Sequence, residues 1–190
     1  CPTWEDYQPQ GDQVVVRLDP GLAFGTGTHQ TTRLCIRQLE RYVVPGCSLL
    51  DMGCGSGILS IAALALGAGR AVGIDIDPTA ARIARENVEQ AGLNQGRFAA
   101  LCADVIQDTT LPGRIGTGFD LIAANIVAHA IVAVCPSFPT FLRPGGTVIT
   151  SGIISERMGE VSAALRAQGL EIVEEQESEG WAAVIARLPQ

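Results

Sequence analysis

Apolar, β-branched segments alternate with helical patterns along most of this chain of 190 residues. Strands that alternate with helices of about 10 to 15 residues indicate βαβ units, and hence a parallel sheet covered by helices on both faces. We expect strands over residues 14–18, 48–51, 71–75, 97–102, 119–124, 147–151, 170–175 and 181–188. Helices are expected over residues 30–42, 58–66, 78–91, 128–135 and 155–167. The last two strands are joined by a short polar stretch, which predicts an antiparallel hairpin at one edge of the sheet.

The composition excludes several classes of protein. With 13 arginines, no lysine and 20 acidic residues, the formal net charge is −7, which argues against a nucleic-acid binder built on a basic surface. No apolar run approaches the roughly 20 residues needed to span a bilayer, and the first residues lack a signal-peptide pattern. We therefore expect a soluble, cytoplasmic protein with neither a nucleic acid nor a membrane as its partner.

The six cysteines and two histidines do not form a metal or disulfide pattern. No two cysteines form a C-x-x-C pair, and His29 and His129 lie far apart in the sequence. We expect no metal site and reduced cysteines buried as small apolar residues. The absence of lysine also excludes a Schiff base and a P-loop phosphate contact.

A glycine-rich turn, Asp51-Met52-Gly53-Cys54-Gly55-Ser56-Gly57, connects an expected strand to an expected helix. Glycines at such a turn let a ligand approach the backbone, and the helix N-terminus offers free N–H groups. Asp75 follows Gly53 by 22 residues, at the end of the next strand, where a carboxylate can accept hydrogen bonds from ribose hydroxyls. The combination predicts a nucleoside-containing ligand, with Gly53, Gly55 and Asp75 in contact with it.

The spacing of the glycines discriminates between nucleoside ligands. A dinucleotide site requires G-x-G-x-x-G, but Ile58 stands where that pattern needs its third glycine, which disfavours an NAD(P)-dependent oxidoreductase. The pattern D-x-G-x-G-x-G instead resembles the first motif of class I S-adenosylmethionine-dependent methyltransferases. This resemblance implies a Rossmann-like α/β fold with a mostly parallel seven-stranded sheet, an antiparallel edge hairpin and helices on both faces.

Polar residues at the ends of later strands are further candidates. Asn125 directly follows six mostly apolar strand residues, so its side chain is expected to point into the ligand crevice. Asp104 lies where this class of methyltransferase commonly contacts the adenine, and capping of its own loop is nearly as good an interpretation. Asp77 precedes Pro78, which favours an N-cap over a ligand contact.

The segment before the first helix resembles a more specific family. Residues 19–32, DPGLAFGTGTHQTT, are similar to the corresponding stretch of the PrmA methyltransferases, which modify ribosomal protein L11. Further matches are DMGCGSGILSIAA at 51–63, GIDIDP at 73–78, Ala124-Asn125-Ile126, LRPGG at 142–146 and Ser151-Gly152-Ile153. The resemblance implies a protein N-methyltransferase that uses S-adenosylmethionine, releases S-adenosylhomocysteine, and acts on lysine and N-terminal amines of L11.

Site residues follow from the same resemblance. The family's cofactor contacts fall on Thr32, Gly53, Asp75 and Asn125, and the loop that contains Phe24 would cover the sulfonium. His29 and Asn125 are the candidate catalytic residues: His29 accepts a proton or positions the amine, or else only caps the following helix. Asn125 sits where the acceptor amine would be oriented. His129 is interpreted as structural or exposed.

Several alternatives remain open at this stage. The acceptor can be another protein lysine or a small molecule, and a cofactor-binding module without catalysis is also possible. Base methylation is disfavoured because Asn125 is not followed by Pro-Pro-aromatic. The glutamates of residues 171–179 can attract a basic partner or form a solvated face, and Trp181 is expected to pack beneath their hairpin.

The expected organisation has two parts. Residues 1–28 are interpreted as a linker strand and a cofactor-covering loop, and residues 29–190 as the methyltransferase domain. The chain opens with Cys1-Pro2-Thr3-Trp4 rather than methionine, as if cut from a longer protein. The N-terminal substrate-recognition domain of the family is therefore expected to be missing, and the remaining domain is expected to be a monomer.

Overall fold

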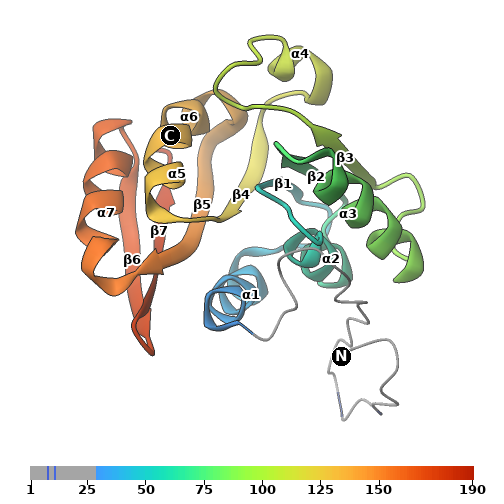
Figure 1. Ribbon diagram of the computed structural model, residues 1–190, viewed down its shortest axis with the longest axis horizontal. Helices are drawn as coiled ribbons and strands as arrows, with labels where there is room; N and C mark the ends of the chain where they lie inside the picture. The colour runs from blue at the N-terminus through green and yellow to red at the C-terminus, as the bar shows by residue number, and fades with distance from the viewer. Residues whose placement is uncertain (1–7, 9–10, 12–28) are drawn as a thin grey trace.

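A computed structural model describes residues 8, 11 and 29–190 of the chain (Figure 1). The strand expected over 14–18 and the loop that contains Phe24 lie outside the described residues. The rest forms a seven-stranded sheet with the order β3-β2-β1-β4-β5-β7-β6. The strands are β1 (Ser48–Met52), β2 (Arg70–Asp75), β3 (Phe98–Cys102), β4 (Phe119–Asn125), β5 (Leu142–Ile154), β6 (Glu171–Ser178) and β7 (Trp181–Arg187).

The first five strands run parallel, and the last two form the predicted antiparallel hairpin at one edge. The helices are α1 (Gln30–Tyr42), α2 (Ile58–Ala65), α3 (Pro78–Gln90), α4 (Leu111–Ile115), α5 (Ala128–Val134), α6 (Phe138–Phe141) and α7 (Met158–Ala167). Short 3₁₀ turns at 135–137 and 155–157 precede α6 and α7. The expected α/β fold, with its mostly parallel sheet and edge hairpin, is confirmed.

The side chains along each strand point alternately to the two faces of the sheet, and this separates the core into two layers. Leu49 of β1 packs on the side of α1 and α2, whereas its neighbour Leu50 packs on the side of α5, α6 and α7. In β4, Leu121 packs on the side of α1 and α2, and its neighbour Ile122 packs on the side of α5, α6 and α7. Because successive side chains of a strand point to opposite faces, both faces of the sheet are buried under helices (Figure 1).

Local signals explain where two of the helices begin. The side chain of His29 accepts a hydrogen bond from the backbone of Thr31 and caps α1. Asp77 accepts one from the backbone N–H of Thr79 at 2.8 Å, and Pro78 occupies the first turn of α3. The capping interpretation of Asp77 is therefore confirmed.

Some elements differ from the expectation. Helices α4 and α6 were not predicted, and β5 begins five residues before residue 147, the expected start of that strand. The five described cysteines are all free, but Cys102 is exposed rather than buried, and its thiol donates to the carbonyl of Ile76 at 3.5 Å. Within residues 29–190, no helix is long and apolar enough to cross a membrane.

Candidate functional site

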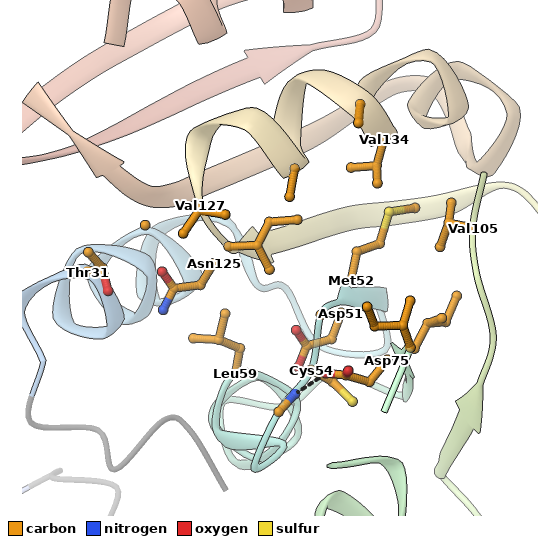
Figure 2. A pocket seen from close by; sticks show the side chains of 18 of the residues that line it. Thr31, Asp51, Met52, Cys54, Leu59, Asp75, Val105, Asn125, Val127 and Val134 are labelled. Carbon is orange, nitrogen blue, oxygen red and sulfur yellow. Dashed lines mark hydrogen bonds between the residues drawn. The ribbon is translucent and has the colours of Figure 1, made fainter. Parts of the chain in front are cut away.

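A cavity of about 720 Å³ opens at the carboxyl ends of β1, β2 and β4 (Figure 2). Parallel strands that end at one edge bring residues distant in sequence to the same crevice. The cavity is lined by the glycine-rich turn and the first residues of α2, by the residues that follow β2 and β3, by α5 along its length, and by residues from α1 and β7. Gly53, Gly55, Asp75, Asp104, Asn125 and His29, all predicted from the sequence, are brought together there.

Asp75 is fixed at the end of β2 by two backbone donors. Its Oδ2 accepts from the N–H of Gly55 at 3.0 Å, the bond that Figure 2 marks with a dashed line, and its Oδ1 accepts from the N–H of Asp77 at 3.0 Å. Each carboxylate oxygen keeps further lone pairs for a ligand. The turn and the acid are therefore one rigid unit in the cavity wall.

Asp51 lies beneath this unit and is almost completely buried. Its Oδ2 accepts from the backbone N–H of Ser60 at 3.1 Å and from the Ser60 hydroxyl at 2.8 Å. Burial raises the pKa of Asp51 to about 6, and the nearby Asp75 carboxylate adds to the rise, while the bonds from Ser60 oppose it. Asp51 thus connects the end of β1 to the first turn of α2.

One end of the cavity has an apolar wall that faces open space. Ile76 is 76% exposed and Ile106 is 54% exposed, and both line the cavity with the smaller Ala103 and Val105. Large aliphatic side chains at such exposure keep apolar surface in contact with water. A ligand that covers this surface gains the free energy of burying it. A flat, largely apolar group such as a purine ring is one that this wall suits.

Asp104 belongs to the same end of the cavity. Its Oδ1 accepts from the backbone N–H groups of Ile106 and Gln107, at 2.8 and 3.2 Å. Asp104 therefore caps its own loop, as the alternative interpretation held. Asp104 also lines the cavity, so the residue that caps the loop is within reach of a ligand as well.

Asn125 ends β4 between the cavity and the start of α1, and Figure 2 shows its amide directed toward α1. Its Nδ2 donates to the Thr32 hydroxyl at 3.3 Å. Its Oδ1 is buried and, within the described part of the chain, has no hydrogen-bond partner. Thr32 is itself buried and does not line the cavity, whereas its neighbour Thr31 does.

His29 and Trp181 form the other end of the cavity. The His29 Nδ1 accepts from the backbone N–H of Thr31 at 3.3 Å and lies 2.8 Å from the Thr31 hydroxyl. A backbone N–H can only donate, so in the neutral ring the proton is on Nε2. The His29 and Trp181 rings meet edge to face, with their centroids 4.8 Å apart.

Sequence reasoning missed part of this end. Trp181 was expected only to pack beneath its hairpin, and His129 was expected to be structural or exposed; His129 is exposed, and both residues line the cavity. Val127, 53% exposed, also lines the cavity. Large apolar residues within two positions of a strand end, as at Ile76 and Val127, are the sequence signal that could have found part of this wall.

Residues 29–190 contain no group of three or more histidines, cysteines or acids that could hold a metal ion. The cavity instead combines three carboxylates held by backbone N–H groups, those of Asp51, Asp75 and Asp104, with a buried amide oxygen and broad apolar walls. This set of groups suits an uncharged nucleoside joined to a polar or charged tail.

Comparisons with known proteins show the family of the chain. Residues 1–189 match the family model described as "Ribosomal protein L11 methyltransferase (PrmA)". The ribosomal protein L11 methyltransferase of Pelotomaculum thermopropionicum is 47% identical over 98% of this chain and 58% of its own length. That of Chloroflexus aurantiacus is 45% identical over 100% of this chain and 63% of its own length. The chain thus spans about three fifths of these relatives.

Solved structures place the fold in the same group. The crystal structure of a ribosomal protein L11 methylase from Lactobacillus delbrueckii subsp. bulgaricus aligns with a TM-score of 0.88 at 35% identity, over 100% of this chain and 93% of that chain. A precorrin methyltransferase from Geobacter metallireducens aligns with a TM-score of 0.72 at 14% identity, over 94% of this chain and 99% of that chain, which shows the shared fold alone. The chain belongs to the PrmA family of ribosomal protein L11 methyltransferases.

Proposed function

We propose that the chain is an S-adenosylmethionine-dependent protein N-methyltransferase that acts on lysine and N-terminal amines of ribosomal protein L11. The observation that carries the proposal is the cavity at the ends of β1, β2 and β4, in a chain that belongs to this family. The relatives are named ribosomal protein L11 methyltransferases, and this name supplies the acceptor.

The cavity residues fit the cofactor in three separate ways. Asp75, held by Gly55 and Asp77, can accept hydrogen bonds from ribose hydroxyls. Ile76 and Ile106 offer an apolar slot for the adenine. The buried Oδ1 of Asn125 is an acceptor suited to the ammonium of the methionine part. When bound, S-adenosylmethionine supplies an electrophilic methyl group on a positively charged sulfur.

The start of α1 suits the carboxylate of the methionine part. The first turn of a helix has N–H groups without partners within the helix, which favour a negative charge. Thr31 stands in this turn and lines the cavity, whereas the buried Thr32 lies behind it, against Asn125. We propose that both threonines contribute to this end, Thr31 from the cavity wall and Thr32 through the side chains that it contacts.

The end formed by His29, Val127 and Trp181 is proposed to receive the acceptor amine. Methyl transfer requires a neutral amine, aligned with the methyl group and shielded from water, but little acid or base apparatus. Apolar Val127 and Trp181 form the wall of this end, and the imidazole of His29, packed edge to face against Trp181, completes it. We therefore assign His29 to positioning of the acceptor rather than to removal of a proton.

The charge of the chain agrees with a basic protein acceptor. The net charge of −7 favours approach of a cationic partner and repels nucleic acid. We further propose that the chain is a cytoplasmic monomer without nucleic acid or membrane partners. Size-exclusion chromatography with light scattering tests its oligomeric state. Phe24, outside the described residues, is proposed on the sequence resemblance to cover the cofactor, and Phe24→Ala tests this by cofactor affinity.

The decisive experiment incubates the chain with S-adenosylmethionine and purified L11 and follows the intact mass of L11. Increments of one methyl group, about 14 Da, support the proposal. Since the chain has no lysine, every methyl-lysine detected belongs to the acceptor. If cofactor binds by calorimetry but L11 stays unmodified, L11 recognition by this chain is refuted; if cofactor does not bind, the proposed function itself is refuted.

A further inference from the structure

Exposed apolar surface continues beyond the cavity along the end of β5. Ile154, the last residue of this strand, is 44% exposed and pairs directly with Trp181, the first residue of β7. Directly paired residues of neighbouring strands point to the same face of a sheet, so Ile154 lies beside Trp181 on the face where Trp181 meets His29. Trp181 lines the cavity and Ile154 does not. We refer to these two side chains as the ledge, because they extend the cavity wall outward.

A backbone contact places two glutamates next to the ledge. The N–H of Ser155 donates to the carbonyl of Gly180 at 3.0 Å. Glu156 follows Ser155 in the chain, and Glu179 precedes Gly180. Both acids are exposed, and both lie within one residue of this hydrogen bond. The end of β5 and the turn of the β6–β7 hairpin thus each bring one carboxylate to the ledge.

These two glutamates have no counter-ion, unlike the acids around them. On the same hairpin, Glu174 pairs with Arg41 at 2.6 Å. In the turn before α7, Arg157 is engaged by Glu160 through two hydrogen bonds, at 2.7 and 2.8 Å. Within residues 29–190, neither acid beside the ledge has an ion-pair partner. Unpaired carboxylates next to exposed apolar surface are complementary to a segment that carries both cationic and apolar groups.

We propose that the ledge, with Glu156 and Glu179, is a docking surface for the acceptor polypeptide, and that it takes an extended segment with apolar and basic residues around the target amine. The inference rests on the proposed function for the place of the amine, at the Trp181 end of the cavity. A segment whose amine enters this end passes over the ledge. An apolar side chain next to the amine covers Ile154, and a basic side chain beyond it pairs with Glu156 or Glu179.

The charge of the surface disfavours other occupants. A second copy of the chain, with its net charge of −7, would bring like charges together, and a nucleic acid would do the same. The opposing interpretation is a solvated face whose charges only protect the edge of the sheet from pairing. Such a face has no effect on the acceptor, so acceptor kinetics separate the two interpretations.

Steady-state methylation of L11 at saturating S-adenosylmethionine tests the surface. The double variant Glu156→Gln/Glu179→Gln should raise the KM for L11 about fivefold at low ionic strength, and Ile154→Ser about threefold. Two controls should stay within about twofold of the wild type: Glu171→Gln, at the far end of β6, and Val44→Ser, an exposed apolar position between α1 and β1. Equal effects of the ledge variants and the controls overturn the proposal.

A second readout does not depend on L11. In ¹⁵N–¹H spectra of the chain, the indole N–H signal of Trp181 is followed during titration with the synthetic peptide Arg-Leu-Lys-Leu-Arg. This signal should shift, and the double variant should need at least about fivefold more peptide for the same shift. The peptide Glu-Leu-Lys-Leu-Glu should leave the signal in place. A signal that neither peptide moves, or that both move equally, overturns the proposal.

Two further outcomes are distinguishable in the same experiments. A Trp181 signal that shifts with the concentration of the chain alone assigns the ledge to a second copy and overturns the proposal. If the wild type does not methylate L11, the proposed function fails, and the peptide titration still decides whether the ledge binds a cationic segment. Far-UV circular dichroism and thermal unfolding verify that each variant is folded.

Discussion

The imidazole of His29 meets the indole of Trp181 edge to face, with 4.8 Å between the ring centroids. His29 precedes the first described helix and Trp181 begins the last strand, so the contact closes one end of the cavity across the whole described domain. The same imidazole caps α1 through Nδ1. A substitution at this position should therefore affect both stability and acceptor handling, and the two effects can be separated.

We predict that His29→Ala lowers the free energy of unfolding by about 1 kcal/mol, because α1 loses its cap, whereas His29→Asn retains the cap and most of the stability. Both variants lose the ring and its Nε2–H, and both should methylate the acceptor at least about tenfold more slowly at saturating cofactor. Urea unfolding and a methyl-transfer assay measure the two effects. If His29→Asn methylated the acceptor at the wild-type rate, His29 would have no role in positioning the acceptor.

Asp75 and Asp77 form a matched pair of acids around the same turn. Asp75→Asn leaves one of the two backbone donors, Gly55 or Asp77, without a carboxylate partner and should weaken cofactor binding about 10- to 100-fold. Asp77→Ala removes only the α3 cap and should cost about 1 kcal/mol of stability at unchanged affinity. Calorimetry and urea unfolding of both variants test this, and equal losses of affinity would contradict it.

Asp51 should make stability depend on pH in a recognisable direction. Its pKa is raised from 3.8 to about 6 in the folded chain, so between these values the folded state binds more protons than the unfolded state. Its contribution to the free energy of unfolding is therefore most favourable below about pH 4, falls as pH rises to about 6, and is then constant. The total decline is of the order of 2 to 3 kcal/mol.

Asp51→Asn isolates this contribution. The stability difference between the variant and the wild type, from urea unfolding at pH 4 to 8, should shift in favour of the variant across the pH 4 to 6 window. Asparagine retains an oxygen that can accept the bonds from Ser60. A difference independent of pH would show that Asp51 titrates near its ordinary value.

Gly152 should tolerate a methyl group less well than Gly169, although both have positive φ, +82° and +77°. A Cβ at Gly169 meets nothing within 4 Å, so Gly169→Ala isolates the backbone strain, about 1 kcal/mol. A Cβ at Gly152 meets the Ile126 carbonyl, so Gly152→Ala should cost about 2 kcal/mol more and weaken cofactor binding. Equal unfolding free energies for the two variants would show that the backbone at Ile126 moves aside at little cost in stability.

Local signals were enough to predict much of this molecule. The pair Asp77-Pro78 marked the start of α3, and the glycine-rich turn with Asp75 marked the cavity, because each depends on a few neighbouring residues. Helix α4 escaped prediction because Pro112 and Gly113, both helix breakers in general, lie within its five residues.

Long-range relationships could not be predicted in the same way. The Pro144-Gly145 sequence is typical of a turn, and it led to a predicted start of β5 after it. The strand in fact begins at Leu142, because residue 142 pairs with Phe119 of β4 across a register shift between Phe119 and Leu121. Trp181 reaches the cavity through the pairing of β7 with β5, and Thr32 meets Asn125 through the packing of α1. No local pattern encodes such contacts between distant segments.

The position of β7 has a consequence for the order in which the two ends of the cavity can form. This strand follows the other six in the chain, yet it lies between β5 and β6 in the sheet and carries Trp181. During synthesis on the ribosome, the residues around Asp75 emerge more than 100 residues before Trp181. A nascent chain can thus assemble its nucleoside-binding half early, while the acceptor half must wait until β7 is inserted between two strands already made.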